Sequence, residues 1–248
     1  MYLNFTPVKT ITQNLKKLTG LAGMIALLAL TLSACVKNNG ATTVVQPQAA
    51  LEVIDASPDA PALDFYVDAT KITAEPLTLG TYTSYFSGNS GINTAFFFQE
   101  GSSILIAKDS IDLIAGKYYS LFLANVKATP DVILFSDTLT NPTTGNAGLR
   151  FIDLSPDAPK VNLVIKGGST LVSNATYKSY TSFLNVPVSA NDTLQVVQSG
   201  TTTVLYTFPL IRLQANTEYT VWLYGLANTT VQSEQLAMGV MENAYFNE

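Results

Sequence analysis

An internal repeat limits the fold of this chain more than any other feature of its sequence. Segment 51–61 matches 149–159 around a shared Ser-Pro-Asp-Ala-Pro motif, segment 81–85 matches 176–180, and segment 113–119 matches 213–219. The three matches occur in the same order, at offsets between 95 and 100 residues. Such self-similarity indicates a duplicated structural unit. Two units of about 95 residues each have the size of ordinary small domains.

Both units carry the pattern of short β-strands. Runs rich in β-branched and aromatic residues alternate with Gly, Pro, Asn and Asp clusters every 8 to 12 residues or so. Beyond residue 35, no stretch keeps helical spacing for more than about two turns. The pattern predicts roughly seven strands per unit, which is typical of a β-sandwich. The clearest runs are 63–67, 94–98, 104–107, 118–126 and 132–139, then 161–165, 194–197, 203–208, 219–226 and 231–238.

A tyrosine follows a turn signal at the same place in each unit. Tyr119 comes three residues after Gly116, and Tyr219 comes three residues after Asn216. Gly and Asn are the residues that best tolerate a left-handed turn conformation. The arrangement is similar to the tyrosine corner of immunoglobulin-like and fibronectin-like sandwiches, whose hydroxyl bonds the backbone. We therefore expect an all-β chain of two tandem immunoglobulin-like (fibronectin-like) β-sandwiches, with Trp222 as a core residue.

The expected boundaries follow from the repeat. The first sandwich takes 50–140 and the second 148–240, and the linker 141–147 is short enough for the two to touch. A loose tail takes 241–248, since chain ends are poorly ordered unless they are tied down.

The first 34 residues have the layout of a secretory signal peptide. Three lysines and no acid precede an uncharged run at 18–36, and small residues lead to Cys35. Residues 32–35, Leu-Ser-Ala-Cys, resemble the bacterial lipobox, in which the cysteine sulfur receives a lipid and the chain is cut just before it. The resemblance implies lipidation at Cys35, and each buried acyl methylene contributes about 0.8 kcal/mol to membrane binding. The alternative interpretation of 18–36 is an uncleaved membrane-spanning helix.

The segment after the lipobox is polar and contains Gly and Pro. It predicts a tether over 35–49 with a reach of roughly 20 Å. The expected location is therefore the cell envelope, at the outer membrane, with the choice between its periplasmic and surface faces left open. The expected contact with the membrane is through the acyl chains on Cys35.

Composition argues against several classes of function. The chain has no histidine and one cysteine, so it lacks the commonest general base and cannot build a cysteine-based zinc site. Three of the 13 Lys and Arg lie in the first 34 residues, so the remainder carries ten against all 18 Asp and Glu, a net charge near −8. An acidic chain repels nucleic-acid phosphates. We expect no catalytic residue, no metal, no cofactor and no nucleic-acid partner.

The Ser-Pro-Asp-Ala-Pro motifs predict tight turns. The serine starts the turn, the proline fixes its second residue, and the aspartate bonds the backbone ahead. The alternative is a calcium site built on Asp55 with Asp59 and on Asp153 with Asp157, although calcium requires more oxygen ligands than these. The structural turn residues are Ser57, Pro58, Asp59, Ser155, Pro156 and Asp157.

Two further groups of side chains have a functional and a structural interpretation. The functional interpretation of Asp64 and Asp68 is an acid–base pair for sugar hydrolysis. On a strand the two residues lie roughly 13 Å apart, which is too far for that chemistry. Several aromatic residues form either a platform for sugar rings or cross-strand packing. These are Tyr82, Tyr85, Tyr177, Tyr180 and Phe96 to Phe98.

Three triplets of Asp, a hydroxyl residue and an aliphatic residue resemble the O-glycosylation sequon of Bacteroidota envelope proteins. Their acceptor residues are Ser110, Thr138 and Thr193. A glycan at these positions requires an exposed hydroxyl.

The repeated segments resemble the bacterial family known as domain of unknown function 4397. Residues 56–61, 64–67 and 115–120 fit its pattern in the first unit, and 155–159, 162–165 and 215–220 fit it in the second. The resemblance implies two copies of the domain in a Bacteroidota lipoprotein. It implies no particular activity. We expect a non-catalytic binding or adhesion module with a protein or glycan ligand. The alternatives are a structural spacer or accessory subunit of an envelope complex and, third, a polysaccharide hydrolase.

Overall fold

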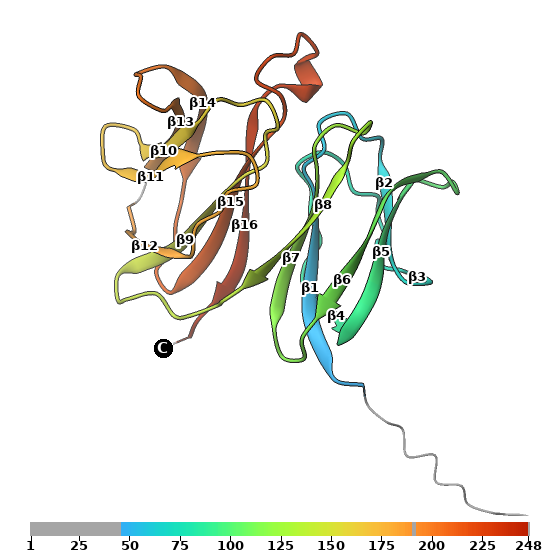
Figure 1. Ribbon diagram of the computed structural model, residues 1–248. Helices are drawn as coiled ribbons and strands as arrows, with labels where there is room; N and C mark the ends of the chain where they lie inside the picture. The colour runs from blue at the N-terminus through green and yellow to red at the C-terminus, as the bar shows by residue number, and fades with distance from the viewer. Residues whose placement is uncertain (1–45, 190–191, 248) are drawn as a thin grey trace, which may run out of the picture. The chain divides into compact units, whose positions relative to one another are not determined.

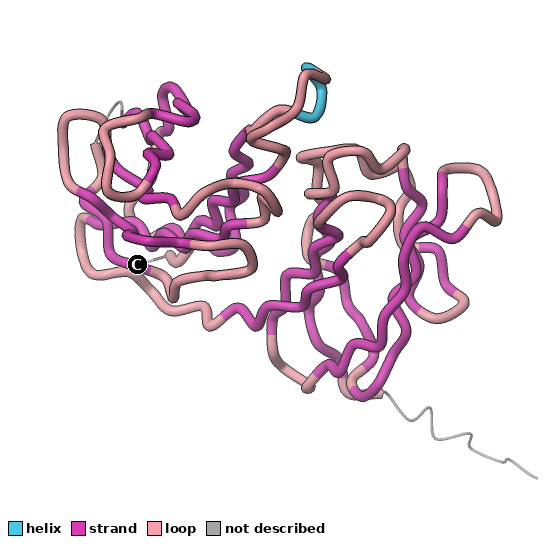
Figure 2. The backbone as a smooth tube through the Cα atoms, turned by 45° about the horizontal axis from the view of Figure 1, so that its top comes forward, coloured by secondary structure: helices cyan, strands magenta, loops and turns pink. Residues whose placement is uncertain are grey.

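The computed structural model describes residues 46–189 and 192–247. Cys35, the expected signal peptide and the tether up to residue 45 lie outside this range. The described chain is all-β apart from one 3-10 turn, η1 (Gln232–Glu234), which is the cyan segment in Figure 2. Within the described residues, no helix has the length and apolar character needed to span a bilayer.

The first repeat folds into two four-stranded sheets (Figure 1). Sheet A has the order β4-β1-β7-β8, and sheet B has the order β3-β2-β5-β6. Neighbouring strands are antiparallel, except that β1 and β7 run parallel. The strands are β1 (Gln48–Asp55), β2 (Leu63–Val67), β3 (Thr70–Lys71), β4 (Phe86–Asn89), β5 (Gly91–Gln99), β6 (Leu105–Leu113), β7 (Tyr118–Ala124) and β8 (Asp131–Asp137).

The second repeat has the same strand order. Sheet C has the order β12-β9-β15-β16, with β9 and β15 parallel, and sheet D has the order β11-β10-β13-β14. The strands are β9 (Asn146–Asp153), β10 (Val161–Ile165), β11 (Thr170–Ala175), β12 (Leu184–Pro187), β13 (Asp192–Gln198), β14 (Val204–Ile211), β15 (Thr217–Tyr224) and β16 (Ala237–Tyr245). Two tandem β-sandwiches are therefore confirmed, with eight strands in each instead of roughly seven.

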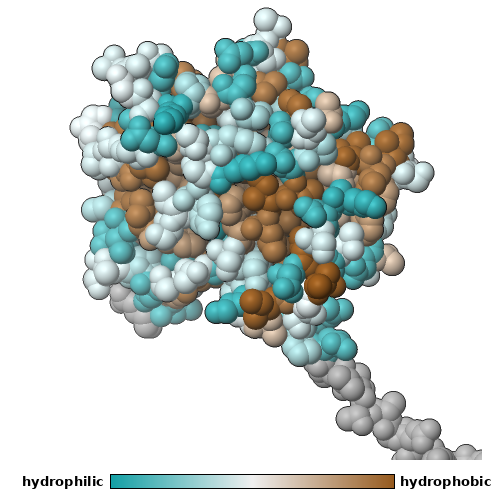
Figure 3. Space-filling model, in the orientation of Figure 1, coloured by the Kyte–Doolittle hydropathy of each residue, from teal (hydrophilic) through white to brown (hydrophobic). Residues whose placement is uncertain are grey.

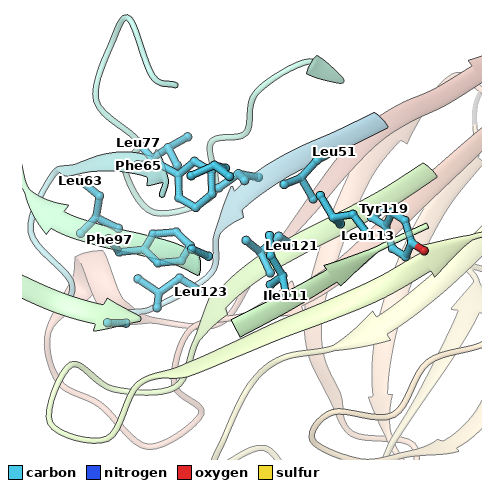
Figure 4. Packing of buried hydrophobic residues seen from close by; sticks show 14 of the residues in the cluster. Leu51, Leu63, Phe65, Leu77, Phe97, Ile111, Leu113, Tyr119, Leu121 and Leu123 are labelled. Atoms are coloured by element: carbon cyan, nitrogen blue, oxygen red, sulfur yellow. The ribbon is translucent and has the colours of Figure 1, made fainter. Parts of the chain in front are cut away.

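Each sandwich has its own hydrophobic core, because alternate strand residues point inward. Figure 4 shows this packing in the first repeat, where Leu51 and Leu121 from sheet A meet Phe65 and Phe97 from sheet B. The second core is built in the same way, from residues such as Leu149 and Val221 of sheet C and Leu163 and Val196 of sheet D. Burial of each such side chain stabilises the fold by about 1.5–3 kcal/mol.

Sheets A and C are buried on both faces, because their outer faces form a third cluster, which we call the junction. Phe122 and Phe135 of the first repeat share this cluster with Ile152, Trp222 and Met241 of the second. The rings of Phe122 and Trp222 lie 5.9 Å apart, edge to face. Trp222 was expected to be a core residue, and it is fully buried. Because β15 directs Val221 and Leu223 into the sandwich, Trp222 packs in the junction.

The junction pairs like with like. Phe122 and Trp222 each come three residues after their repeat's corner tyrosine, and they contact each other. Contact between equivalent positions is typical of an isologous, two-fold interface. Both sandwiches belong to one compact unit that begins at Gln46.

The last strand differs from its sequence-based boundaries. The expected strand at 231–238 is mostly a loop with η1, and β16 continues to Tyr245, into the segment expected to be a loose tail. The loop after β15 is longer than the loop after β7, which delays the final strand. Its Met241 and Asn243 are buried in the junction, which ties this end of the chain down. At the other boundaries, β1 begins at Gln48, and β9 begins at Asn146.

Candidate functional site

Backbone hydrogen bonds correct one of the three sequence matches. Val53 N donates to Thr83 Oγ1 (3.0 Å), and Phe151 N donates to Thr181 Oγ1 (3.1 Å), at an offset of 98 residues. Isolated bridges likewise pair Ile54 with Tyr82 and Ile152 with Tyr180. The match of 81–85 with 176–180 was therefore three residues out of register. The true counterparts are Tyr82-Thr83-Ser84-Tyr85 and Tyr180-Thr181-Ser182-Phe183, and their shared Tyr-Thr-Ser was the signal in the sequence.

The two Ser-Pro-Asp turns attach to a neighbouring loop. Ser57 Oγ donates to the Asn125 carbonyl and Ser155 Oγ to the Gly225 carbonyl, both at 2.7 Å. Because β1 and β7 run parallel, the turn after β1 lies beside the loop after β7. Pro58 and Pro156 occupy the same place in the two turns, each directly before its aspartate.

The aspartates of these turns bond the same loops. Asp59 accepts from Lys127 N (2.6 Å), and Asp157 accepts from Ala227 N (2.7 Å). Both aspartates therefore bond backbone N–H groups, as expected, but these groups lie about 70 residues further along the chain. The acids before the turns act locally, since Asp55 accepts from Ser57 N (2.9 Å) and Asp153 from Ser155 N. No group of three or more potential metal-ligating acids, His or Cys occurs in 46–189 or 192–247.

Replacement of Ser155 with alanine should lower the free energy of unfolding by about 1–2 kcal/mol. Ser155 is buried, and the variant leaves the Gly225 carbonyl without its donor. Urea unfolding of Ser155→Ala beside Ser173→Ala, a change at an exposed position of β11, measures the effect. Equal stability of the two variants would contradict the assigned bond.

The corner tyrosines bond the turns ahead of them. Tyr119 Oη accepts from Ile114 N (3.1 Å), and Tyr219 Oη accepts from Gln214 N (3.3 Å). The intervening Gly116 and Asn216 have φ values of +74° and +61°, in the left-handed region. These bonds have the geometry of a tyrosine corner.

The remaining acids of the sequence analysis bond within the fold. Asp64 pairs with Lys71 (2.8 Å) and accepts from Gly101 N (3.1 Å), while Asp68 accepts from Thr94 N (2.8 Å). Both carboxylates therefore stabilise the β2–β5 region of sheet B.

The three candidate glycosylation residues differ in exposure. Ser110 on β6 and Thr138 after β8 are exposed, and Thr193 on β13 is half-buried.

The aromatic residues proposed as one platform do not come together. Phe97 is in the core, whereas Phe96 and Phe98 stack on the outer face of β5 with rings 5.9 Å apart. Tyr85 donates to Asp137 and Tyr177 donates to Asp131, each at 2.7 Å. The two that stay open are the equivalent pair, Tyr82 (44% exposed) and Tyr180 (61% exposed).

A buried polar cluster lies beside the apolar part of the junction. Arg150 on β9 is 2% exposed and pairs with Asp137 of β8 at 2.6 Å. It also donates to Thr220 Oγ1 (2.7 Å) and to Ser120 Oγ (3.1 Å). Asn243 bridges the repeats, since it accepts from Thr220 and donates to Glu52. None of these residues was identified from the sequence, because their burial depends on contact between the sandwiches.

The hydrogen count of this cluster places a proton on Glu52. Ser120 Oγ lies 2.7 Å from a Glu52 oxygen and 2.8 Å from an Asp137 oxygen, but its single hydrogen can serve only one of them. Asp137 carries the charge that Arg150 neutralises, so Glu52 is the partner that donates to Ser120. Burial raises the pKa of Glu52 to about 8, in agreement with this count.

The stability of the fold should decrease as the pH rises from about 5 to 8.5. Between the ordinary pKa of 4.5 and the folded pKa of about 8, the folded state keeps on Glu52 a proton that the unfolded state releases. The Glu52→Gln variant lacks this titration. Between pH 5 and 8.5, its free energy of unfolding should therefore decrease by about 1 kcal/mol or more less than that of the parent. Urea unfolding of both proteins at the two pH values measures the difference, and identical pH profiles would contradict the protonated Glu52.

A second buried acid lies at the linker. Glu218 on β15 accepts from Thr140 N (3.1 Å), and burial raises its pKa to about 7. Through this bond the segment between β8 and β9 is attached to sheet C.

A pocket of about 340 Å³ opens next to the polar cluster. We call it the junction pocket, and it is lined by Ser136, Thr138, Thr140, Arg150 and segment 180–183. The Tyr180 ring packs on Phe135 across the junction at 4.9 Å, and the Arg150 guanidinium lies over the Phe183 ring at the same distance. The pocket thus offers an exposed aromatic face surrounded by hydroxyl groups.

A larger pocket of about 590 Å³ lies in the first repeat, between segments 72–77 and 81–86. We call it the repeat-1 pocket. It contains Tyr82, whose ring packs edge-on against Trp222 at 6.0 Å. In this repeat the chain leaves the sheet after the two-residue strand β3, whereas the equivalent segment of the second repeat continues as the six-residue strand β11.

The buried acid pair of the junction does not reach either pocket. Glu52 and Asp137, joined through Ser120, are 1% and 4% exposed, and neither lines a pocket. Of the acids in the described residues, only Glu75 lines either of these two pockets, and it lines the repeat-1 pocket. Hydrolysis of a glycosidic bond needs two accessible carboxyl groups, so this arrangement does not favour it.

Exposed hydrophobic surface gathers elsewhere in the first repeat. Figure 3 shows it over β8 and towards the β5–β6 hairpin, where Ile104 and Leu105 are exposed. These aliphatic side chains bring no hydrogen-bonding group. The pockets are therefore the better candidates for a polar ligand.

Several solved β-structures show weak similarity to the chain. A family 26 carbohydrate-binding module from Eubacterium rectale Amy13K, in complex with maltoheptaose, is 8% identical over 76% of this chain and 100% of its own, with a TM-score of 0.24. An alpha-glucan-binding streptococcal virulence factor is 10% identical over 77% and 97%, with a TM-score of 0.24. The fimbrial anchor protein Mfa2 from Porphyromonas gingivalis is 11% identical over 80% and 98%, with a TM-score of 0.24.

No curated protein sequence matches this chain. A family model matches part of it, from β1 through all of the first repeat and into β10 of the second. Residues 49–164 thus match the family described as "Domain of unknown function (DUF4397)".

Proposed function

We propose that this protein is a non-catalytic binding module, anchored to the cell envelope by lipid on Cys35, that holds a neutral glycan in the junction pocket. The observation that carries the proposal is Tyr180, a ring 61% exposed over a pocket surrounded by hydroxyl side chains. An aromatic face receives the apolar face of a sugar ring, and hydroxyls exchange hydrogen bonds with its polar edge.

The free hydroxyl groups of the pocket support a polyhydroxylated ligand. Within the described residues, the side chains of Ser136, Thr138 and Ser182 have no hydrogen-bond partner, so each can bond a ligand. The net charge near −8 after residue 34 favours a neutral glycan over an acidic one, because like charges repel.

A second candidate is a structural spacer, favoured by the buried junction. The cluster around Trp222 and the Arg150–Asp137 pair fix the two sandwiches to each other. Such a spacer would need no ligand, so a binding measurement separates the two functions.

Isothermal titration calorimetry of the full chain in detergent, with maltohexaose, cellohexaose and mannohexaose, tests glycan binding. We expect at least one of them to bind and Tyr180→Ala to weaken that binding by tenfold or more. Tyr245→Ala, a change to another exposed tyrosine, is the matched control. Absence of heat with all three sugars, or equal binding by Tyr180→Ala, would overturn the proposal.

Lipid anchoring predicts a change of cell fraction. The Cys35→Ala variant lacks the sulfur that receives the lipid, so the protein should move from the membrane fraction and lose its acyl mass. Immunoblots of separated fractions and intact mass spectrometry measure both effects. Firm membrane retention of a processed Cys35→Ala protein would contradict the anchor.

A further inference from the structure

We infer that the repeat-1 pocket is a second glycan subsite, equivalent to the junction pocket, so that one chain takes two neutral sugar units. The inference rests on the proposed function. The same tetrapeptide position lines both pockets, with Tyr82 to Tyr85 in one and Tyr180 to Phe183 in the other.

The two segments are held by the same set of backbone bonds. Gly80 N donates to the Asp55 carbonyl, and Lys178 N donates to the Asp153 carbonyl. The carbonyls that follow, of Thr81 and Ser179, accept from the N–H groups of the same two aspartates. Each tetrapeptide is therefore presented in the same conformation beside the first strand of its repeat.

The two tetrapeptides use equivalent positions in the same way. The threonine hydroxyl bonds the backbone, and the first tyrosine and the serine leave their hydroxyls unbonded within the described part of the chain. Thr83 and Thr181 accept backbone N–H groups. In the described residues, the hydroxyls of Tyr82 and Ser84, and likewise of Tyr180 and Ser182, have no partner. Each tetrapeptide therefore leaves one tyrosine and one serine hydroxyl free to bond a ligand.

The opposite walls differ and make the subsites unequal. The repeat-1 pocket is closed by 72–77, which adds the Glu75 carboxylate. The junction pocket is closed by Ser136 at the end of β8, by residues 138 and 140 after it, and by Arg150. The repeat-1 pocket should therefore reject acidic sugars more strongly. Two linked subsites also raise the avidity for a repeating glycan without any new contact.

Photo-crosslinking with disaccharides tests the second subsite. A disaccharide can occupy one pocket alone, so each pocket is labelled independently of the other. Full-length protein in detergent is irradiated with maltose, cellobiose and mannobiose, each with a diazirine at its reducing end, and the labelled peptides are mapped by mass spectrometry. We expect label in both 81–86 and 180–183.

Two matched variants block one pocket each. Ser84 and Ser182 are equivalent and exposed, so Ser84→Trp and Ser182→Trp fill the pockets without removing a junction contact. Each should reduce the label of its own segment tenfold or more and leave the other unchanged. Label in 180–183 alone would overturn the second subsite, as would label in 81–86 that Ser84→Trp does not reduce. Absence of label from both segments would overturn the proposed function as well.

Discussion

Replacement of Arg150 with methionine should lower the free energy of unfolding by about 3–5 kcal/mol. The variant keeps an unbranched side chain of similar length but leaves the buried Asp137 carboxylate without its counter-charge. Removal of one partner from a buried ion pair has a cost of that order, because the remaining charge stays out of water. Ser120 and Thr220 also lose the donor that they share.

Urea unfolding gives this value, and Arg212→Met is the control because Arg212 is exposed. Combination of Arg150→Met with Asp137→Asn should restore part of the loss, since the uncompensated charge is then gone. An Arg150→Met protein within about 0.5 kcal/mol of the parent would show that the pair is not buried as described.

Replacement of Trp222 with alanine should lower the free energy of unfolding by about 3–5 kcal/mol, as other large-to-small changes of buried aromatic residues do. Trp222 is fully buried and contacts Phe122 and Tyr82 of the first repeat. The indole also lies against Gly239 of β16, where an added Cβ would come within 2.0 Å of the ring. Residue 239 must therefore be glycine for the indole to pack here.

Loss of the Trp222 ring should also change how the two sandwiches unfold. Because the ring joins the two sandwiches, the variant should weaken the coupling between them, and calorimetry should resolve two transitions. Phe65→Ala removes a ring of the first core and should lower the stability of that repeat without uncoupling the junction. A single sharp transition for Trp222→Ala, at the temperature of the parent, would contradict the coupling.

Most of the fold could be predicted from the sequence. Alternation of apolar residues and turn signals placed β2 and β10 at their observed bounds, and the repeat identified two sandwiches. β16 was misplaced because its position depends on the length of the loop before it. Trp222 was expected in a core, but the sequence did not show that it packs in the junction, because sheets A and C are buried on both sides. Alternation cannot distinguish a core face from a junction face.

The candidate site was predicted only in part. Tyr82 and Tyr180 were named for their aromatic rings, but Ser182 and Phe183 were missed because the repeat was aligned three residues out of register. The cluster of Glu52, Arg150 and Asp137 could not be found, since its members come from strands far apart in the sequence. Local patterns do not report long-range contacts between repeats.

The proposed function depends most on the junction pocket as a glycan site. A crystal structure of the protein with the hexaose that binds most tightly tests this directly. We expect a sugar ring stacked on Tyr180 within hydrogen-bond distance of Ser136, Thr138 or Ser182. An empty junction pocket, with the sugar held elsewhere, would contradict it.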